Sequence, residues 1–153
     1  MDASGPDTAH YQCVQYNAFQ LIDLVEYHRT SGDDAVLAVI GRLLPFVRAG
    51  ADPAGGAYYD CGLGRRRIVY HSAARAAALT AAFAVGSRLG LTPEEGEASL
   101  AAADRGLGWV LARQRADGSL PFSVCEYGVL RDRRSYPRNL AMILLHLLPA
   151  VGP

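Results

Sequence analysis

One structural unit repeats along this chain: a helix, a tight turn, a second helix and a long loop. The unit has a period of roughly 60 residues and occurs about two and a half times. Because the turn inside the unit is short, its two helices must lie antiparallel. The sequence therefore predicts an all-α fold of antiparallel helical hairpins, with about five helices and two long loops. We expect one domain over residues 10–150, preceded by a disordered N-terminus over residues 1–9.

Apolar residues recur at helical spacing in five segments, and turn and cap residues mark their ends. The predicted helices span residues 11–30, 33–47, 70–89, 92–114 and 135–148. Gly32 ends the first helix, and Asp33 or Asp34 caps the second. Thr92, three residues before Glu95, predicts a capping box at the start of the fourth.

The two long loops, at about residues 49–68 and 115–134, show no alternation strong enough to predict a sheet. Only residues 57–59 and 120–122 could form short extended segments. The helix after the first loop is rich in alanine between Ala73 and Ala84, and small side chains let another helix approach closely. We therefore expect the third helix to pack closely against its neighbours.

Composition and charge exclude several classes of partner. The chain has 15 basic and 15 acidic residues, and the basic ones, all arginine, are scattered along it. This pattern lacks the positive surface that nucleic acid or an anionic membrane requires. No apolar run is long enough to span a bilayer, and the N-terminus has no signal core. We expect a cytoplasmic protein with reduced cysteines, and the arginine- and alanine-rich composition is typical of a GC-rich bacterial genome.

Several short segments resemble the α/α-toroid superfamily, which includes terpenoid cyclases, prenyltransferases and six-hairpin carbohydrate-active proteins. Residues 114–120, QRADGSL, look like the QxxxGx loop of squalene and terpene cyclases, with Leu120 where those enzymes have tryptophan. Residues 54–58 resemble this loop more loosely, and residues 16–19 and 27–33 are similar to segments of six-hairpin proteins. The resemblance covers residues 10–150 and implies inner and outer helices that alternate around a central cavity.

The chain also departs from that superfamily. It supplies at most three hairpins, so it resembles only the C-terminal part of a toroid, and it lacks the DxDD motif that protonates the substrate in squalene-hopene cyclases. A partial ring leaves apolar helix faces uncovered at both ends. We therefore expect a homo-oligomer or docking on a larger protein subunit.

In a toroid of this kind, the long loops and the first turns of helices one, three and five share one rim. Three helix N-termini at that rim would favour an anion, and the tyrosine, histidine, asparagine and arginine there suit hydroxyl-rich or carboxylate-bearing ligands. The alternative is that these side chains bond to loop backbone. The predicted ligand-binding residues are His10, Gln15, Asn17, Tyr59, Tyr70, Tyr127, Tyr136, Arg138 and Asn139.

Asp60, His71 and Glu126 are the rim residues suited to general acid/base catalysis. The alternative is that Asp60 caps a turn and that Glu126 pairs with an arginine such as Arg131.

We predict no cofactor and no metal. Cys61, His71 and Cys125 could meet as a zinc site, as toroid prenyltransferase β-subunits and lanthionine cyclases hold zinc at a comparable place. The chain, however, has neither CxxC nor HxxxH spacing, and ordinary reduced thiols are the alternative.

Together these features predict a partial α/α toroid that binds or converts a small molecule at its rim. The resemblance implies a carbohydrate-like ligand or an isoprenoid-type biosynthetic intermediate, and a cyclase-, lyase- or epimerase-like enzyme or a subunit of one. We prefer the polar ligand, because carbocation cyclases need an aromatic-lined pocket and this chain has one tryptophan. The alternative is a noncatalytic helical interaction or scaffold module.

Overall fold

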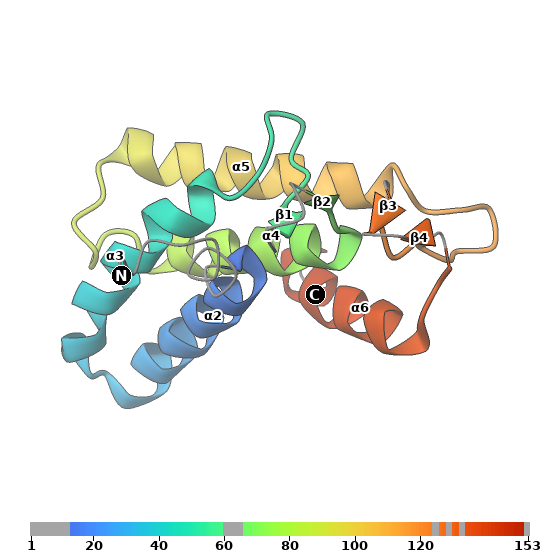
Figure 1. The fold of residues 1–153 in the computed structure, drawn as a ribbon. Coiled ribbons are helices and arrows are strands. Elements are labelled where there is room, and N and C mark those ends of the chain that lie inside the picture. Colours follow the sequence, from blue (N-terminus) through green and yellow to red (C-terminus); the bar gives the residue numbers. More distant parts are fainter. Residues whose placement is uncertain (1–12, 60–65, 124–125, 128–129, 132–133, 152–153) are drawn as a thin grey trace, which may run out of the picture.

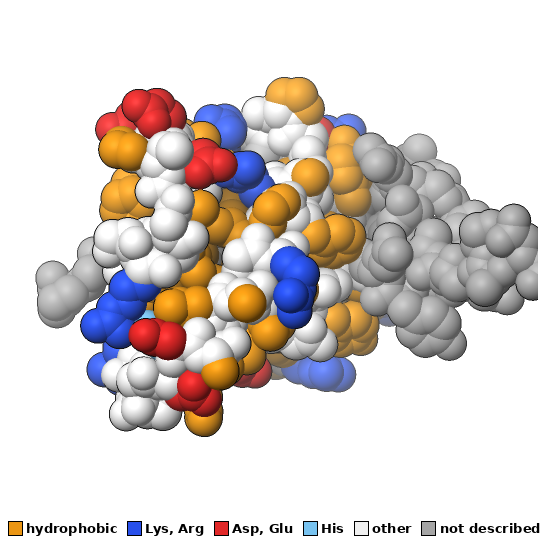
Figure 2. Space-filling model, turned by 90° about the vertical axis from the view of Figure 1, so that its left-hand side faces the viewer, with side chains coloured by type: hydrophobic (Ala, Val, Ile, Leu, Met, Phe, Trp, Pro, Cys, Tyr) orange, Lys and Arg blue, Asp and Glu red, His pale blue; other side chains and the backbone are white. Residues whose placement is uncertain are grey.

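The computed structural model describes residues 13–59, 66–123, 126–127, 130–131 and 134–151, and this part of the chain has the predicted all-α fold (Figure 1). Its α-helices are α2 (Val14–Ser31), α3 (Leu37–Ala49), α4 (Val69–Ala84), α5 (Pro93–Leu111) and α6 (Pro137–Val151). Its smaller elements are the 3₁₀ helix η1 (Asp34–Val36) and the strands β1 (Tyr58–Tyr59), β2 (Arg66–Arg67), β3 (Glu126–Tyr127) and β4 (Leu130–Arg131). None of the helices in the described part of the chain could span a bilayer. On the face shown in Figure 2, arginine and acidic side chains are interspersed with apolar ones.

Helix α4 lies at the centre of the fold and contacts each of the other four α-helices. In Figure 1, α5 lies above α4, whereas α2 and α6 lie below it. The alanines of α4 allow this close packing, as the sequence predicted, because they leave room for neighbouring helices on several sides. Opposite Ala76, a Cβ on Gly106 of α5 would lie only 3.4 Å from the alanine Cβ. The fold is therefore built around one almost fully buried small-residue helix.

Three predicted caps are confirmed, at the end of α2 and at the starts of η1 and α5. Gly32 adopts the left-handed conformation with φ 70° and ends α2. The Asp33 carboxylate accepts the Ala35 amide at 2.9 Å and caps η1. At the start of α5, the Thr92 hydroxyl accepts the Glu95 amide and the Glu95 carboxylate accepts the Thr92 amide, which confirms the capping box.

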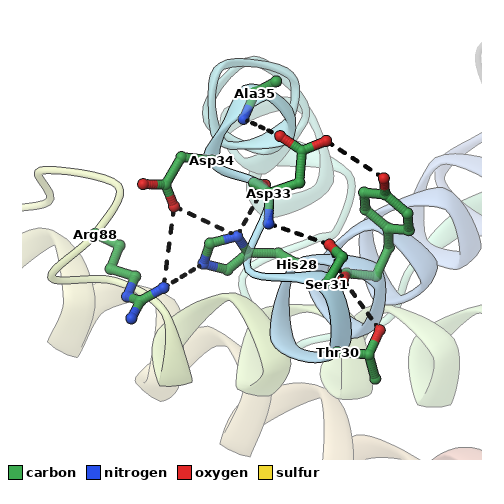
Figure 3. Close-up of polar contacts among 8 residues, drawn as sticks. His28, Thr30, Ser31, Asp33, Asp34, Ala35 and Arg88 are labelled. Atoms are coloured by element: carbon green, nitrogen blue, oxygen red, sulfur yellow. Dashed lines mark hydrogen bonds and ion pairs between the residues drawn. The ribbon is translucent and has the colours of Figure 1, made fainter.

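A polar cluster holds the turn between α2 and η1 against the connection from α4 to α5 (Figure 3). Arg88 Nη1 lies 3.0 Å from Nε2 of the buried His28. Because arginine can only donate, His28 Nε2 accepts, and Nδ1 carries the proton that it donates to the Asp33 carbonyl at 3.1 Å. Asp34 lies within 4 Å of both His28 and Arg88. The cluster thus fixes the entry to the second helix of the first hairpin.

The third predicted helix is shorter than expected: α4 ends at Ala84, not at Leu89. Residues 85–90 form successive tight turns, in which the Val85 amide bonds to the Ala82 carbonyl and the Gly86 amide to the Phe83 carbonyl. Gly90 then takes the left-handed conformation with φ 69°. Two glycines within five residues make continuation of the helix unfavourable, and the helical periodicity alone did not reveal this.

Each long loop contains a small antiparallel hairpin. Tyr58 pairs with Arg67 across β1 and β2, so the extended segment at residues 57–59 is confirmed in part. In the backbone pairing of β3 and β4, Glu126 lies opposite Arg131. The sequence did not predict this hairpin, because two-residue strands are too short to show alternation. Residues 120–122 form no strand, although the Phe122 carbonyl accepts the Val69 amide and so ties the second loop to the start of α4.

Candidate functional site

The described part of the chain contains a pocket of about 210 Å³ where α2, α4 and α6 begin; we call it the polar pocket. It is lined by Gln15, Tyr16, Ile68, Tyr70, His71, Phe122, Arg138 and Asn139.

Each of the three helices contributes its second and third residues to the polar pocket. These are Gln15 and Tyr16 of α2, Tyr70 and His71 of α4, and Arg138 and Asn139 of α6. A helix N-terminus carries a partial positive charge, because its first amide groups have no partner within the helix. Three such ends meet at this pocket, so the structure brings together the helix N-termini on which the prediction of an anion site was based.

The helix ends at the polar pocket differ from those of α5 and η1. None of α2, α4 and α6 has an acidic residue in its first turn, and the N-cap residues of α2 and α4, Cys13 and Ile68, form no side-chain cap hydrogen bond. By contrast, α5 begins with the Thr92 capping box and two glutamates, and η1 begins with an aspartate cap. The helix ends at the pocket therefore lack the acidic side chains that α5 and η1 carry, although the Val69 amide of α4 is already bonded to the Phe122 carbonyl.

Gln15 and Tyr70 are the buried polar residues that join α2 to α4 at the pocket. The Gln15 side-chain amide donates a hydrogen bond to the Tyr70 hydroxyl. Burial raises the pKa of Tyr70 to about 12, with a smaller contribution from the nearby Tyr16, so the phenol stays protonated at neutral pH. Because its oxygen accepts from Gln15, the hydroxyl proton can be donated to a ligand.

His71 is 3% exposed, and burial lowers its pKa to about 3, although a hydrogen bond with the Tyr58 backbone opposes the shift. Its ring is therefore neutral at physiological pH. Arg138 is exposed and is the only cationic side chain among the residues that line the polar pocket. The site thus combines one full positive charge, three helix ends and neutral hydrogen-bonding groups.

Five of the predicted site residues meet in the polar pocket: Gln15, Tyr70, His71, Arg138 and Asn139.

Two other predicted residues lie outside its lining. Asn17 turns back to donate to the Cys13 carbonyl at 3.0 Å. Tyr136 packs its ring edge-on against Phe122, with the ring centres 5.8 Å apart.

The remaining predictions fall where the structure gives no side-chain geometry. Tyr59, Glu126 and Tyr127 are placed only as strand residues, and His10 and Asp60 lie outside the described residues. The catalytic roles of Asp60, His71 and Glu126 stay predictions.

Tyr16, Ile68 and Phe122 line the pocket but were missed as site residues. Tyr16 could have been predicted, because it directly follows Gln15 near the start of a helix expected at the rim. Ile68 and Phe122 could not have been predicted, because no local feature of the sequence distinguishes them from core residues.

The zinc hypothesis also stays a prediction. The described residues contain no cluster of three or more histidine, cysteine or acidic side chains that could hold a metal ion. Cys61 and Cys125, two of the three proposed ligands, lie outside the described residues.

Comparison of the chain with family models, with curated proteins and with solved structures gives no match.

Proposed function

We propose that the protein binds a small molecule that carries a carboxylate or a cluster of hydroxyl groups in the polar pocket. The observation that carries this proposal is the convergence of three helix N-termini, each without acidic residues in its first turn, on one pocket beside Arg138. Arginine binds carboxylates in a two-pronged geometry, and Gln15, Tyr70 and Asn139 add neutral hydrogen-bonding groups.

Within this proposal, the ligand is a carbohydrate-like molecule or an isoprenoid-type biosynthetic intermediate, and the fold is a partial α/α toroid of a cytoplasmic protein. Conversion of the ligand, in a cyclase-, lyase- or epimerase-like reaction, requires a proton acceptor near neutral pH. The low pKa of His71 suits a hydrogen-bonding role better than this one. We therefore propose binding first and assign any proton transfer to Asp60 or Glu126.

The second candidate is a noncatalytic interaction module that forms a homo-oligomer or docks on a larger subunit. It is supported by Leu144, Leu145 and Leu148, which lie close together in the sequence of α6 and are each more than half exposed. An exposed apolar row of this kind is typical of a protein-binding surface. Light scattering over a concentration series tests it, since a monomer at all concentrations argues against self-association.

The binding proposal is tested by titrating the ¹⁵N-labelled protein with acetate, glucuronate and glucose while amide chemical shifts are recorded. We expect the carboxylates to shift the backbone amides of Arg138 and Asn139, and Arg138→Gln to weaken binding at least tenfold. Arg42→Gln, which changes an exposed arginine on α3, is the matched control and should bind as the unmodified protein does. If neither carboxylate nor sugar shifts these amides, the proposed function is wrong.

A further inference from the structure

A second pocket, of about 420 Å³, lies between the same three helices, and we call it the apolar pocket. Its lining is Ile22 of α2, Ala77, Thr80, Ala81 and Ala84 of α4, and Leu145 and His146 of α6. The alanines leave this space open because their side chains are too short to fill it. The Thr80 hydroxyl is already bonded to the Ala76 carbonyl at 3.0 Å, so it adds little polarity.

The two pockets lie along the same faces of their helices. Ile22 follows Gln15 by seven residues, and Ala77 follows Tyr70 by seven. On α6 the same spacing separates Arg138 from Leu145 and Asn139 from His146. Seven residues are about two helical turns, or roughly 10 Å, and bring a side chain back to nearly the same face. The pockets are therefore the polar and apolar parts of one strip, which begins at the helix N-termini.

An aromatic cluster marks the boundary between the two parts. The ring of Phe19 lies 6.1 Å from that of Tyr70 in the polar pocket and is stacked at 5.2 Å on that of His146 in the apolar pocket. His146 is 7% exposed. Burial lowers its pKa, which keeps the ring neutral. The apolar pocket therefore has no charged group in its lining.

We propose that the ligand is an amphiphilic carboxylate, whose head binds at Arg138 and the three helix N-termini and whose alkyl chain passes Phe19 into the apolar pocket. This inference rests on the proposed function and names its ligand class. One arginine in the lining matches the single charge of a carboxylate, and an uncharged cavity two turns away matches an aliphatic chain. The apolar pocket, of about 420 Å³, is in the range of ordinary small-molecule sites, whereas the polar pocket, of about 210 Å³, is smaller and suits a head group rather than a whole ligand.

The test measures the affinity of the whole chain for butyrate, hexanoate, octanoate and decanoate by calorimetry, below their micellar concentrations. Each methylene that enters the apolar pocket should strengthen binding about fourfold. Ala81→Leu fills that pocket, so it should remove the dependence on chain length while leaving butyrate affinity unchanged. The matched control, Ala101→Leu on an exposed face of α5, should leave the whole series unchanged.

The outcomes separate the two proposals. If butyrate binds but longer chains bind no more tightly, the amphiphile assignment is overturned and the proposed function stands. If neither butyrate nor decanoate binds, the amphiphile assignment fails together with the carboxylate form of the proposed function, and only glucose binding would then support the hydroxyl form. If decanol binds as tightly as decanoate, the carboxylate makes no contribution and its assignment as the head group is overturned. If the affinity of Ala81→Leu still rises with chain length as in the unmodified protein, the alkyl chain binds elsewhere and its assignment to the apolar pocket is overturned.

Discussion

Arg75 offers the sharpest test of how this fold is held together. It lies in the middle of α4, is 3% exposed, and forms no ion pair among the described residues. Instead, its guanidinium donates to three backbone carbonyls: Val47 at 2.8 Å, Arg48 at 2.5 Å and Ala102 at 3.4 Å. Burial lowers its pKa to about 10, so the group is still charged at neutral pH. One side chain therefore links α4 to the end of α3 and to α5.

Replacement of Arg75 by methionine should lower the free energy of unfolding by about 3 kcal/mol. The carbonyls of Val47 and Arg48 belong to the last turn of α3, where a positive charge also interacts favourably with the helix dipole. Each short bond from a charged donor is worth about 1.5–3 kcal/mol, and part of this gain is offset because the variant no longer buries a charge. For a chain of this size, the loss corresponds to a decrease in melting temperature of roughly 10 °C.

The assay is thermal and urea unfolding followed by circular dichroism at the helix band. Arg75→Lys keeps the charge but has one nitrogen in place of three, so it should recover only part of the stability. Arg42→Met, on the exposed face of α3, is the matched control and should change stability by no more than about 0.5 kcal/mol. A melting temperature for Arg75→Met that is unchanged or higher would refute the reasoning, since it would mean that the desolvation penalty exceeds the three hydrogen bonds.

Four other substitutions test contacts elsewhere in the fold. Tyr70→Phe should fold, lose about 1 kcal/mol with the bond from Gln15, and weaken carboxylate binding; unchanged affinity would remove the hydroxyl from the site. Thr92→Ala should cost about 1 kcal/mol in urea unfolding through the lost cap, and an unchanged midpoint would contradict the cap's contribution. Gly55→Ala should cost at least about 2 kcal/mol, because φ is 100° and a Cβ would clash with the Arg105 carbonyl oxygen; Gly90→Ala, where φ is 69° and a Cβ would meet open space, should cost less. Finally, the pKa of His71 is about 3 in the folded state and near 6.5 in the unfolded chain. Between these pH values the unfolded chain binds more protons, so the free energy of unfolding should fall by about 1.4 kcal/mol per pH unit as the pH decreases from 6.5 towards 3. His71→Gln should flatten this part of the pH profile, and an unaltered slope would assign it to other groups.

Local features of the sequence predicted the helices and much of the polar pocket. The Thr92 capping box and the Gly32 stop depend on residues within one turn, so they can be recognised without knowledge of the rest of the chain. Since the helix starts were located, the residues in their first turns could be named as a group. Gln15, Tyr70 and Arg138 were identified in this way.

The rotation of each helix was settled only by packing. Gln15 and Asn17 are two positions apart in the same first turn, yet successive helical residues point about 100° apart, so one faces the pocket and the other turns back to the Cys13 carbonyl. From the sequence alone, Gln15 and Asn17 are equally good candidates for the site. Packing of α2 against α4 turns Gln15, and not Asn17, towards the pocket.

The sequence alone determined which segments form helices and where those with a clear cap begin or end, because caps, turns and helical periodicity are local interactions; the end of α4 at Ala84 was the exception. The tertiary structure alone decided which side chains meet, because those partners are distant in the chain. The carbonyls that hold the Arg75 guanidinium lie 27 or 28 residues away, and the Gln15 and Tyr70 side chains that meet at the pocket are 55 residues apart. Packing brings such groups together by burying apolar surface over whole helices, and no short segment of sequence carries that information.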